Sequence, residues 1–241
     1  MPLRNIALGS VACAAFTYAL LSGGAGAQAA AAGGHPDFSG LWRCAQHCGN
    51  GELLPGDKLQ MTPEAQRLYA TKKAAVDKGD RTVDTALACH PLGLPRLAMF
   101  GTFEIFQSPE RMGVIGEWVG PGRIMYFTNT HRKGIFPTFM GDGIARWEGN
   151  TLVIDTVNFE EQTLLDSSGF PHSDQFHFVE RWNLSADGKT ITSDWTIEDP
   201  KMFKVPFTKQ VVYARKDAAD ETQRLVEDVC QNVEDNGHLV K

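Results

Sequence analysis

The sequence lacks the motifs that identify several large enzyme classes. It has no glycine-rich phosphate-binding loop, no Gly-x-Ser-x-Gly nucleophile elbow and no His-Glu-x-x-His zinc motif. Each of these motifs holds a reacting group by a fixed local geometry, so a chain without it has no simple route to the same chemistry. Nucleotide-dependent catalysis and serine hydrolase chemistry of the familiar kinds are therefore not expected.

Positive charge is also scarce. The chain has 23 basic and 29 acidic residues, and loss of residues 1–27 would remove Arg4 alone, leaving 22 basic residues. Binding to nucleic acid depends on clustered cations that neutralise phosphates. We therefore expect no nucleic-acid partner.

Long apolar runs are confined to the beginning of the chain. Arg4 precedes an apolar stretch from Ile6 to Leu21, and the small residues Ala25-Gly26-Ala27 follow it. This pattern predicts a cleavable signal peptide over residues 1–27 and a periplasmic or secreted protein. A membrane span is the alternative, but the stretch is interrupted and shorter than the ~20 residues that cross a bilayer. After cleavage we expect no membrane association.

Few cysteines remain in the exported chain: Cys44, Cys48, Cys89 and Cys230. An even set in an oxidising compartment predicts disulfides, and three pairings are formally possible. We favour Cys44 with Cys48 and Cys89 with Cys230. A zinc site that includes Cys44, His47 and Cys48 is the alternative, because their spacing suits zinc ligands.

The remaining chain is expected to form one domain. Residues 28–34 are a low-complexity linker, and residues 35–241 are numerous enough for a single β-barrel. Thr62 as N-cap and Pro63 at the first helical position predict one surface helix that ends near Lys78, before Gly79. Period-two patterns predict strands at about 97–107, 111–119, 122–129, 144–148, 151–157, 175–184, 190–197 and 207–215.

These elements predict a mainly β fold. Turn residues separate most strands and no alternating βαβ pattern is present, so sequence neighbours should pair antiparallel in a barrel. A two-sheet β-sandwich is the alternative. The Gly40-Leu41-Trp42 sequence resembles the first-strand signature of lipocalin-like barrels, although a glycine turn before a core tryptophan explains it equally well.

Several blocks resemble a large, mostly uncharacterised family of secreted bacterial proteins. They are PDFSGLW at residues 36–42, CHPLGLPR from Cys89, GDGIARWEGNTLVIDTVNF from Gly141, PHSDQFHFVERW from Pro171 and the Glu198-Asp199-Pro200 step. Asn150 and Gly143 depart from the aspartate and serine usual in that family. The resemblance implies an exported lipocalin-like barrel but no particular reaction.

The block around residue 177 holds the predicted catalytic residues. Alternation puts Glu180 on the same strand face as Phe178 and Trp182, where burial would raise its pKa toward a value useful for proton transfer. His177 has the opposite parity, so without a bulge it faces the other way. A structural ion pair of Glu180 with Arg146 or Arg123 is the alternative.

His172 and Asp174 complete the predicted catalytic set, as a loop acid or base and its orienting carboxylate. Asp155 and Asp142 are possible partners. A backbone-bonded histidine and a turn-capping aspartate are the structural alternatives. A four-ligand metal site is disfavoured by the parity of His177 and Glu180, and no metal or cofactor is predicted. An unusual nucleophile among the serines near His172, at positions 167, 168 and 173, rests on proximity alone.

Together these residues predict a cavity for a small apolar, aromatic compound and cofactor-free acid/base chemistry of the lyase, isomerase or hydrolase type. The predicted substrate-binding residues are Arg146, Tyr126, Trp147 and Trp182. A carrier or binding protein with the same cavity and no turnover is the alternative, and a purely structural protein is a third. The oligomeric state is left open.

Overall fold

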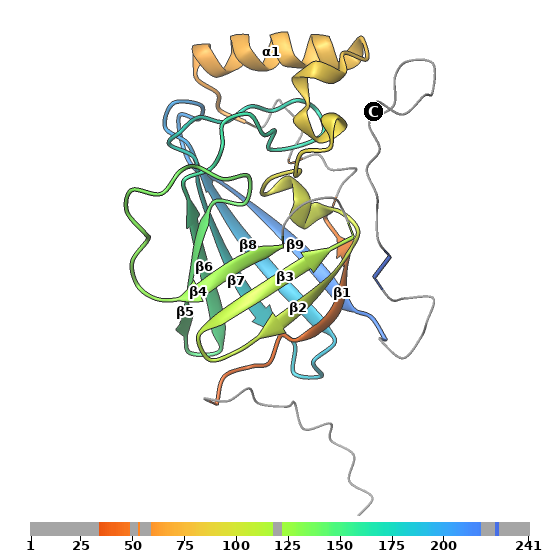
Figure 1. The fold of residues 1–241 in the computed structure, drawn as a ribbon, viewed down its shortest axis with the longest axis vertical. Coiled ribbons are helices and arrows are strands. Elements are labelled where there is room, and N and C mark those ends of the chain that lie inside the picture. The colour runs from red at the N-terminus through yellow and green to blue at the C-terminus, as the bar shows by residue number, and fades with distance from the viewer. Residues whose placement is uncertain (1–33, 49–52, 54–58, 118–121, 218–224, 227–241) are drawn as a thin grey trace, which may run out of the picture.

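Nine strands close into one barrel in the computed structural model, which describes residues 34–48, 53, 59–117, 122–217 and 225–226 (Figure 1). The predicted barrel is confirmed, and the alternative sandwich is wrong. The strands are β1 (Gly40–Gln46), β2 (Thr102–Gln107), β3 (Arg111–Gly116), β4 (Arg123–Phe127), β5 (Asp142–Glu148), β6 (Thr151–Val157), β7 (His177–Leu184), β8 (Thr190–Glu198) and β9 (Phe207–Arg215).

Strand alternation fills the barrel interior. On β7, Phe178, Glu180 and Trp182 are buried, whereas His177 and Arg181 point outward. The interior is therefore a packed core of large side chains with a few polar groups among them. The predicted opposite orientation of His177 and Glu180 is confirmed.

The pairing of β4 with β5 departs from the prediction, because these two strands are parallel. All other neighbouring strands pair antiparallel, including β9 with β1, which closes the barrel. A parallel pair needs a long crossover connection. Residues 128–141 provide it outside the barrel, in the loop that Figure 1 shows beside β4 and β5.

The predicted helix is confirmed as α1 (Pro63–Asp77), which lies across one end of the barrel (Figure 1). The Thr62 hydroxyl accepts a hydrogen bond from the Ala65 amide at 3.1 Å, and Gly79 follows the helix with a φ of 77°. The prediction of a strand from residue 97 is wrong at its beginning. Short 3-10 helices, η2 (Arg81–Val83), η3 (Thr85–Ala88) and η4 (Arg96–Met99), precede β2 instead.

Trp42 is fully buried near the start of β1. Its indole N–H donates to the Phe38 carbonyl at 2.9 Å, and the Arg215 guanidinium lies 4.2 Å from its ring. Arg215 also donates to the Ser39 carbonyl at 2.6 Å. The first and last strands are thus joined by a cation–π contact and a hydrogen bond in addition to their ladder.

The predicted Cys44–Cys48 disulfide is confirmed, with a Cα–Cα distance of 6.0 Å. It rules out the alternative zinc site, because both thiolates are consumed. Cys89 is also disulfide-bonded, and Cys230 lies outside the described residues, so their pairing stays a prediction. The expected signal peptide lies outside them as well, as does the linker up to residue 33. Among the described helices, none has the length and hydropathy to cross a bilayer.

Candidate functional site

Glu180 is fully buried inside the barrel and forms an ion pair with Arg123 of β4. The Arg123 side chain is only 5% exposed. Trp182 donates its indole N–H to Glu180 Oε1 at 3.2 Å, and Arg123 Nη2 donates to Thr156 Oγ1 at 3.0 Å. The predicted ion-pair alternative is confirmed for Arg123, while Arg146 pairs with Glu148 on the outer face.

One hydrogen-bond donor of this polar cluster has no acceptor among the described residues. Within the described part of the chain, Arg123 Nε has no hydrogen-bond partner, and Glu180 Oε2 has none beyond the ion pair. Such buried unpaired groups are uncommon, since the loss of hydration is not compensated. They identify a position where a ligand atom would be favourable.

Arg123 lines a hollow between η4 and the adjacent strand ends. Its cavity volume is about 40 Å³, and it is open to solvent. Its wall is mostly apolar and consists of Leu94, Leu97, Ala98, Phe100, Phe103, Val114, Gly116, Glu117, Arg123, Trp182 and Tyr213. η4 and β2 to β4 contribute most of it, and β7 and β9 contribute Trp182 and Tyr213.

The other ionisable groups of this hollow are already bonded. The Tyr213 hydroxyl donates to the Ala98 carbonyl at 3.0 Å, and burial raises the pKa of this phenol well above its usual value. Glu117 accepts a hydrogen bond from the Thr102 amide at 3.0 Å. Tyr213 is therefore neutral, and among the described residues that line the hollow, Arg123 alone has a buried side-chain donor without a hydrogen-bond partner, its Nε.

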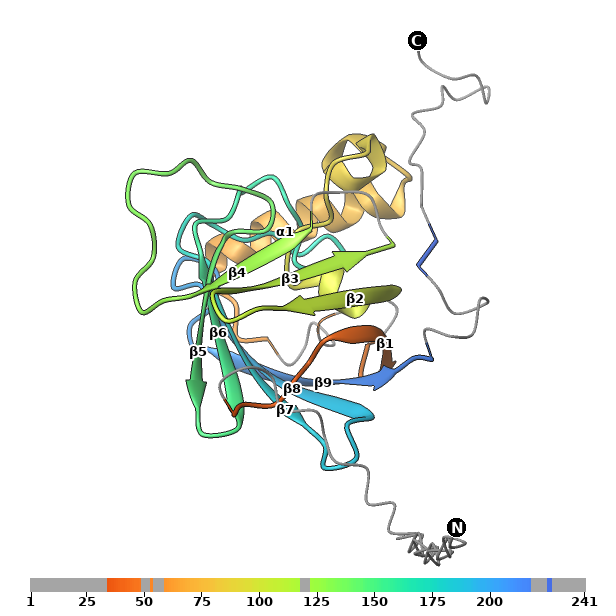
Figure 2. The ribbon, with the colours of Figure 1, turned by 60° about the horizontal axis from the view of Figure 1, so that its bottom comes forward.

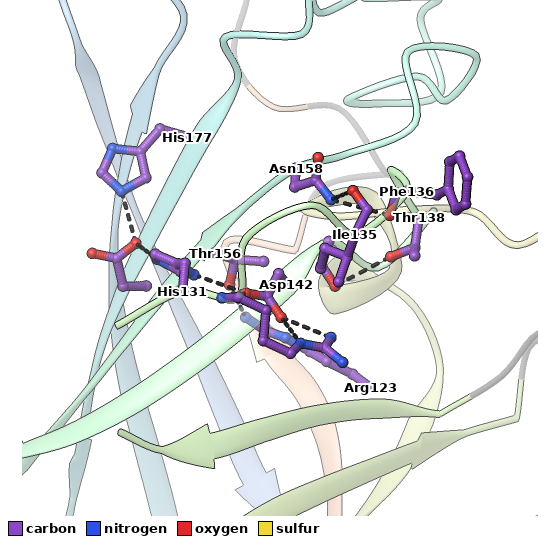
Figure 3. Close-up of polar contacts among 12 residues, drawn as sticks. Arg123, His131, Ile135, Phe136, Thr138, Asp142, Thr156, Asn158 and His177 are labelled. Carbon is purple, nitrogen blue, oxygen red and sulfur yellow. Dashed lines mark hydrogen bonds and ion pairs between the residues drawn. The ribbon is translucent and has the colours of Figure 1, made fainter. Parts of the chain in front are cut away.

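A second polar cluster lies on the outer face of β5 to β8 (Figure 3). Asp155 Oδ1 contacts Nε2 of both His131 and His177, at 3.0 and 2.9 Å. The other ring nitrogen of His131 lies 3.2 Å from Asp142, and that of His177 lies 3.2 Å from Glu198. Two imidazoles thus alternate with three carboxylates.

This arrangement favours the charged form of His177, because a carboxylate only accepts hydrogen bonds and this imidazole faces one on both sides. The hydrogen bond that His177 donates to Asp155, opposed by partial burial, raises the pKa of His177 above its ordinary value. The same bond lowers the pKa of Asp155. A protonated His177 cannot accept a proton, so this residue is suited to holding charge rather than to base catalysis.

The outer cluster also holds the crossover loop in place. Burial alone would raise the pKa of Asp142, but the Arg132 amide and guanidinium and His131 lower it below the usual range. Arg132 contacts Asp142 through its backbone N–H at 3.0 Å and its Nε at 2.7 Å. Further along the loop, Asn158 donates to the Phe136 carbonyl at 3.1 Å (Figure 3).

His172 and Asp174 lie apart from both clusters. His172 is buried, with Nδ1 3.1 Å from the Ser173 carbonyl and Nε2 2.7 Å from the Thr163 hydroxyl. Burial lowers its pKa, so it is neutral and donates through Nδ1. Asp174 is exposed and pairs with Lys201. Ser173 donates to Asp199 at 2.7 Å.

The four predicted catalytic residues therefore do not converge on one cavity. Glu180 is inside the barrel, His177 is outside it, and His172 and Asp174 belong to the connection before β7. The predicted substrate-binding residues are also dispersed. Arg146 and Tyr126 face outward, and Trp147 stacks on His35 at 4.5 Å. Trp182 alone of these four lines the hollow.

In the residues that the structure describes, no group of three or more His, Cys, Asp or Glu side chains is placed so that it could hold a metal ion. No protein-family model matches the chain, and no curated protein is significantly similar to it. The family resemblance drawn from the sequence blocks stays a prediction. What the structure defines is a closed nine-stranded barrel with a buried ion pair beside an apolar hollow.

Arg123 and His131 differ in how far the sequence predicted their roles. Arg123 was foreseen only as a possible partner of Glu180, and its position beside a hollow depends on η4, which the strand pattern concealed. His131 was not foreseen, because an isolated histidine in a connection has no periodicity to reveal its contacts. The alternation rule that placed Glu180 inside the barrel did predict a polar group in the interior.

Proposed function

We propose that this chain is an exported protein that binds a small apolar compound carrying one hydrogen-bond acceptor, in the hollow between η4 and the ends of β2 and β3. The observation that carries the proposal is the unpaired Nε of Arg123, a buried donor on a residue that lines a mostly apolar hollow. Ligand sites in proteins combine this kind of wall with a few directed polar groups.

The charge of the site favours a neutral ligand. Arg123 is already balanced by Glu180, and the carboxylate of Glu180 would repel an anion. A ketone, aldehyde, ester or phenol oxygen can accept from Arg123 Nε without adding charge. Phe103 and Trp182 offer ring surfaces to an aromatic body.

The size of the hollow sets how the ligand lies. A cavity of about 40 Å³ that is open to solvent takes the acceptor group and little more, because one water already needs about 10–15 Å³ by the same measure. The apolar body would therefore lie toward the opening.

Binding without turnover is the function that this geometry supports best. General acid or base catalysis needs a group that is free to exchange a proton near the working pH. Glu180 is held by Arg123 and Trp182, Tyr213 donates to Ala98, and Glu117 accepts from Thr102. A carrier role is accordingly preferred, and lyase, isomerase or hydrolase activity is the alternative hypothesis.

Export is part of the proposal. The leader-like pattern of residues 1–27 and the disulfide between Cys44 and Cys48 both fit an oxidising compartment outside the cytosol. Mass spectrometry of the chain recovered from its own host, with the mature N-terminus determined, tests this part alone. An uncleaved N-terminus with reduced cysteines would contradict it.

Ligand binding can be tested with acetophenone and ethylbenzene, which are similar in size and differ in the carbonyl oxygen. Calorimetry on the mature protein should show tighter binding of acetophenone by about 2- to 10-fold, the worth of one net hydrogen bond. Arg123→Lys keeps the positive charge but lacks Nε, so it should abolish this preference. Equal affinities in the parent would contradict the assigned role of Arg123.

A matched pair of variants tests the location. Val114→Trp places an indole in the hollow and should block binding, whereas Val212→Trp adds the same bulk on the outer face of β9. Loss of binding in both variants, or in neither, would contradict the proposed site. Thermal unfolding of each variant checks that the barrel is intact.

A further inference from the structure

Large apolar side chains are concentrated on the outer face of β2, β3 and β4. Phe106, Ile115, Ile124 and Tyr126 are 51%, 50%, 50% and 38% exposed. Contiguous exposed apolar surface of this kind is unusual on a soluble protein and commonly marks an interaction site. Figure 1 and Figure 2 show these three strands side by side, and no helix of the described residues lies across their outer face.

The strand register arranges this face in rows. Phe106, Gly113 and Ile124 lie directly opposite one another across the three strands. A side chain at Gly113 would meet no atom within 4 Å. The glycine is thus the floor of a shallow groove of about 300 Å³ whose walls include Phe106 and Ile124.

Two opposite charges flank the central row. Glu104 pairs with Ile115 in the row on one side, and Arg111 pairs with Tyr126 in the row on the other side. Neither Glu104 nor Arg111 has an ion-pair partner among the described residues. The face therefore carries an unpaired acid, an apolar row and an unpaired base in succession.

We propose that this face binds a second copy of the chain. A two-fold axis that runs across the strands over Gly113 would bring each central row onto the same row of the other copy. The rows on either side would exchange places, so that Arg111 of one copy lies over Ile115 of the other, one strand away from Glu104. The same operation forms this acid–base contact twice.

This self-complementarity favours a second copy over other occupants. A membrane surface would match the apolar row but would leave the carboxylate of Glu104 without a partner. A sheet face three strands wide is small compared with a standard interface of about 800 Å² per partner. We therefore expect a reversible dimer that dissociates on dilution. This inference is independent of the ligand hollow, which opens between η4 and the strand ends.

Sedimentation velocity of the mature protein over a wide range of concentration tests the proposal. The parent should change from monomer to dimer as its concentration rises. Ile124→Glu, which places two like charges against each other at the centre, should weaken the dimer at least tenfold. Thr192→Glu adds the same charge on the outer face of β8 and should leave the dimer unchanged.

Charge reversal tests the geometry separately. Glu104→Arg and Arg111→Glu should each weaken the dimer, and the double reversal should restore it. A parent that is monomeric at every concentration, equal effects of Ile124→Glu and Thr192→Glu, or no recovery in the double reversal would overturn the proposal. A monomer that binds phosphatidylcholine vesicles, with binding lost in Ile124→Glu, would overturn it in favour of a membrane surface.

Discussion

The buried pair of Arg123 and Glu180 allows a quantitative prediction. Arg123→Met keeps an unbranched apolar chain but leaves the Glu180 carboxylate with only the Trp182 N–H. Glu180→Gln leaves the guanidinium uncompensated beside Thr156. Removing one partner of a fully buried ion pair costs about 3–5 kcal/mol, so each variant should be destabilised by this amount.

The double variant Arg123→Met/Glu180→Gln distinguishes pair breakage from simple loss of contacts. Because the charge left behind by the first change is removed by the second, the double variant should cost about as much as one single variant. The coupling free energy would then be about 3–5 kcal/mol, at or above the upper end of values for residues in contact. Urea unfolding followed by far-UV circular dichroism measures all four proteins, provided the m-values agree. Single effects that simply add would refute the assignment of a coupled buried pair.

Three further predictions concern pH and the disulfide. Because the pKa of His177 is raised, its contribution to stability is complete below its ordinary pKa and is lost as pH rises through the raised value. The difference in stability between the parent and His177→Gln should therefore become smaller in alkaline buffer. If the stability difference between the parent and His177→Gln does not change with pH, the proposed contact of a charged His177 is contradicted. The pKa of His172 is lowered by burial, so its contribution is complete above the ordinary value and falls as pH decreases; the loss of stability in acid should be smaller in His172→Gln, as thermal unfolding would show. The Cys44→Ser/Cys48→Ser variant should lose about 2 kcal/mol in the chain-entropy model for so short a loop, and reduction of the parent should reproduce this loss in urea unfolding.

Alternation along strands made much of the fold predictable. The period-two pattern of Phe178, Glu180 and Trp182 was sufficient to place one carboxylate in the core, and turn residues located most hairpins. The parallel pairing of β4 and β5 was not predictable, because residues 128–141 have no helical or strand pattern that signals a crossover. Register across such a connection is set by tertiary contacts and not by local chemistry.

The site was less predictable for a related reason. Parity identifies the face on which a side chain lies but not its partner on another strand. Arg123 and Glu180 are separated by 57 positions and meet only because the barrel closes. In the same way, His131 and His177 share one oxygen of Asp155 because the crossover loop returns over β6. His177 and Glu180 were grouped into one predicted site because they are close in sequence, but their side chains lie on opposite faces of the barrel wall.

The seam between β4 and β5 has a consequence for access to the interior. It is joined by only three residue pairs, whereas β7 with β8 and β8 with β9 each have eight. The backbone amides of β4 should therefore exchange with deuterated solvent sooner than those of β8, through local separation that leaves most of the wall intact. Because Arg123 lies on β4, each such separation would expose its guanidinium to solvent. Small molecules could then reach the barrel interior through the gap between the two strands.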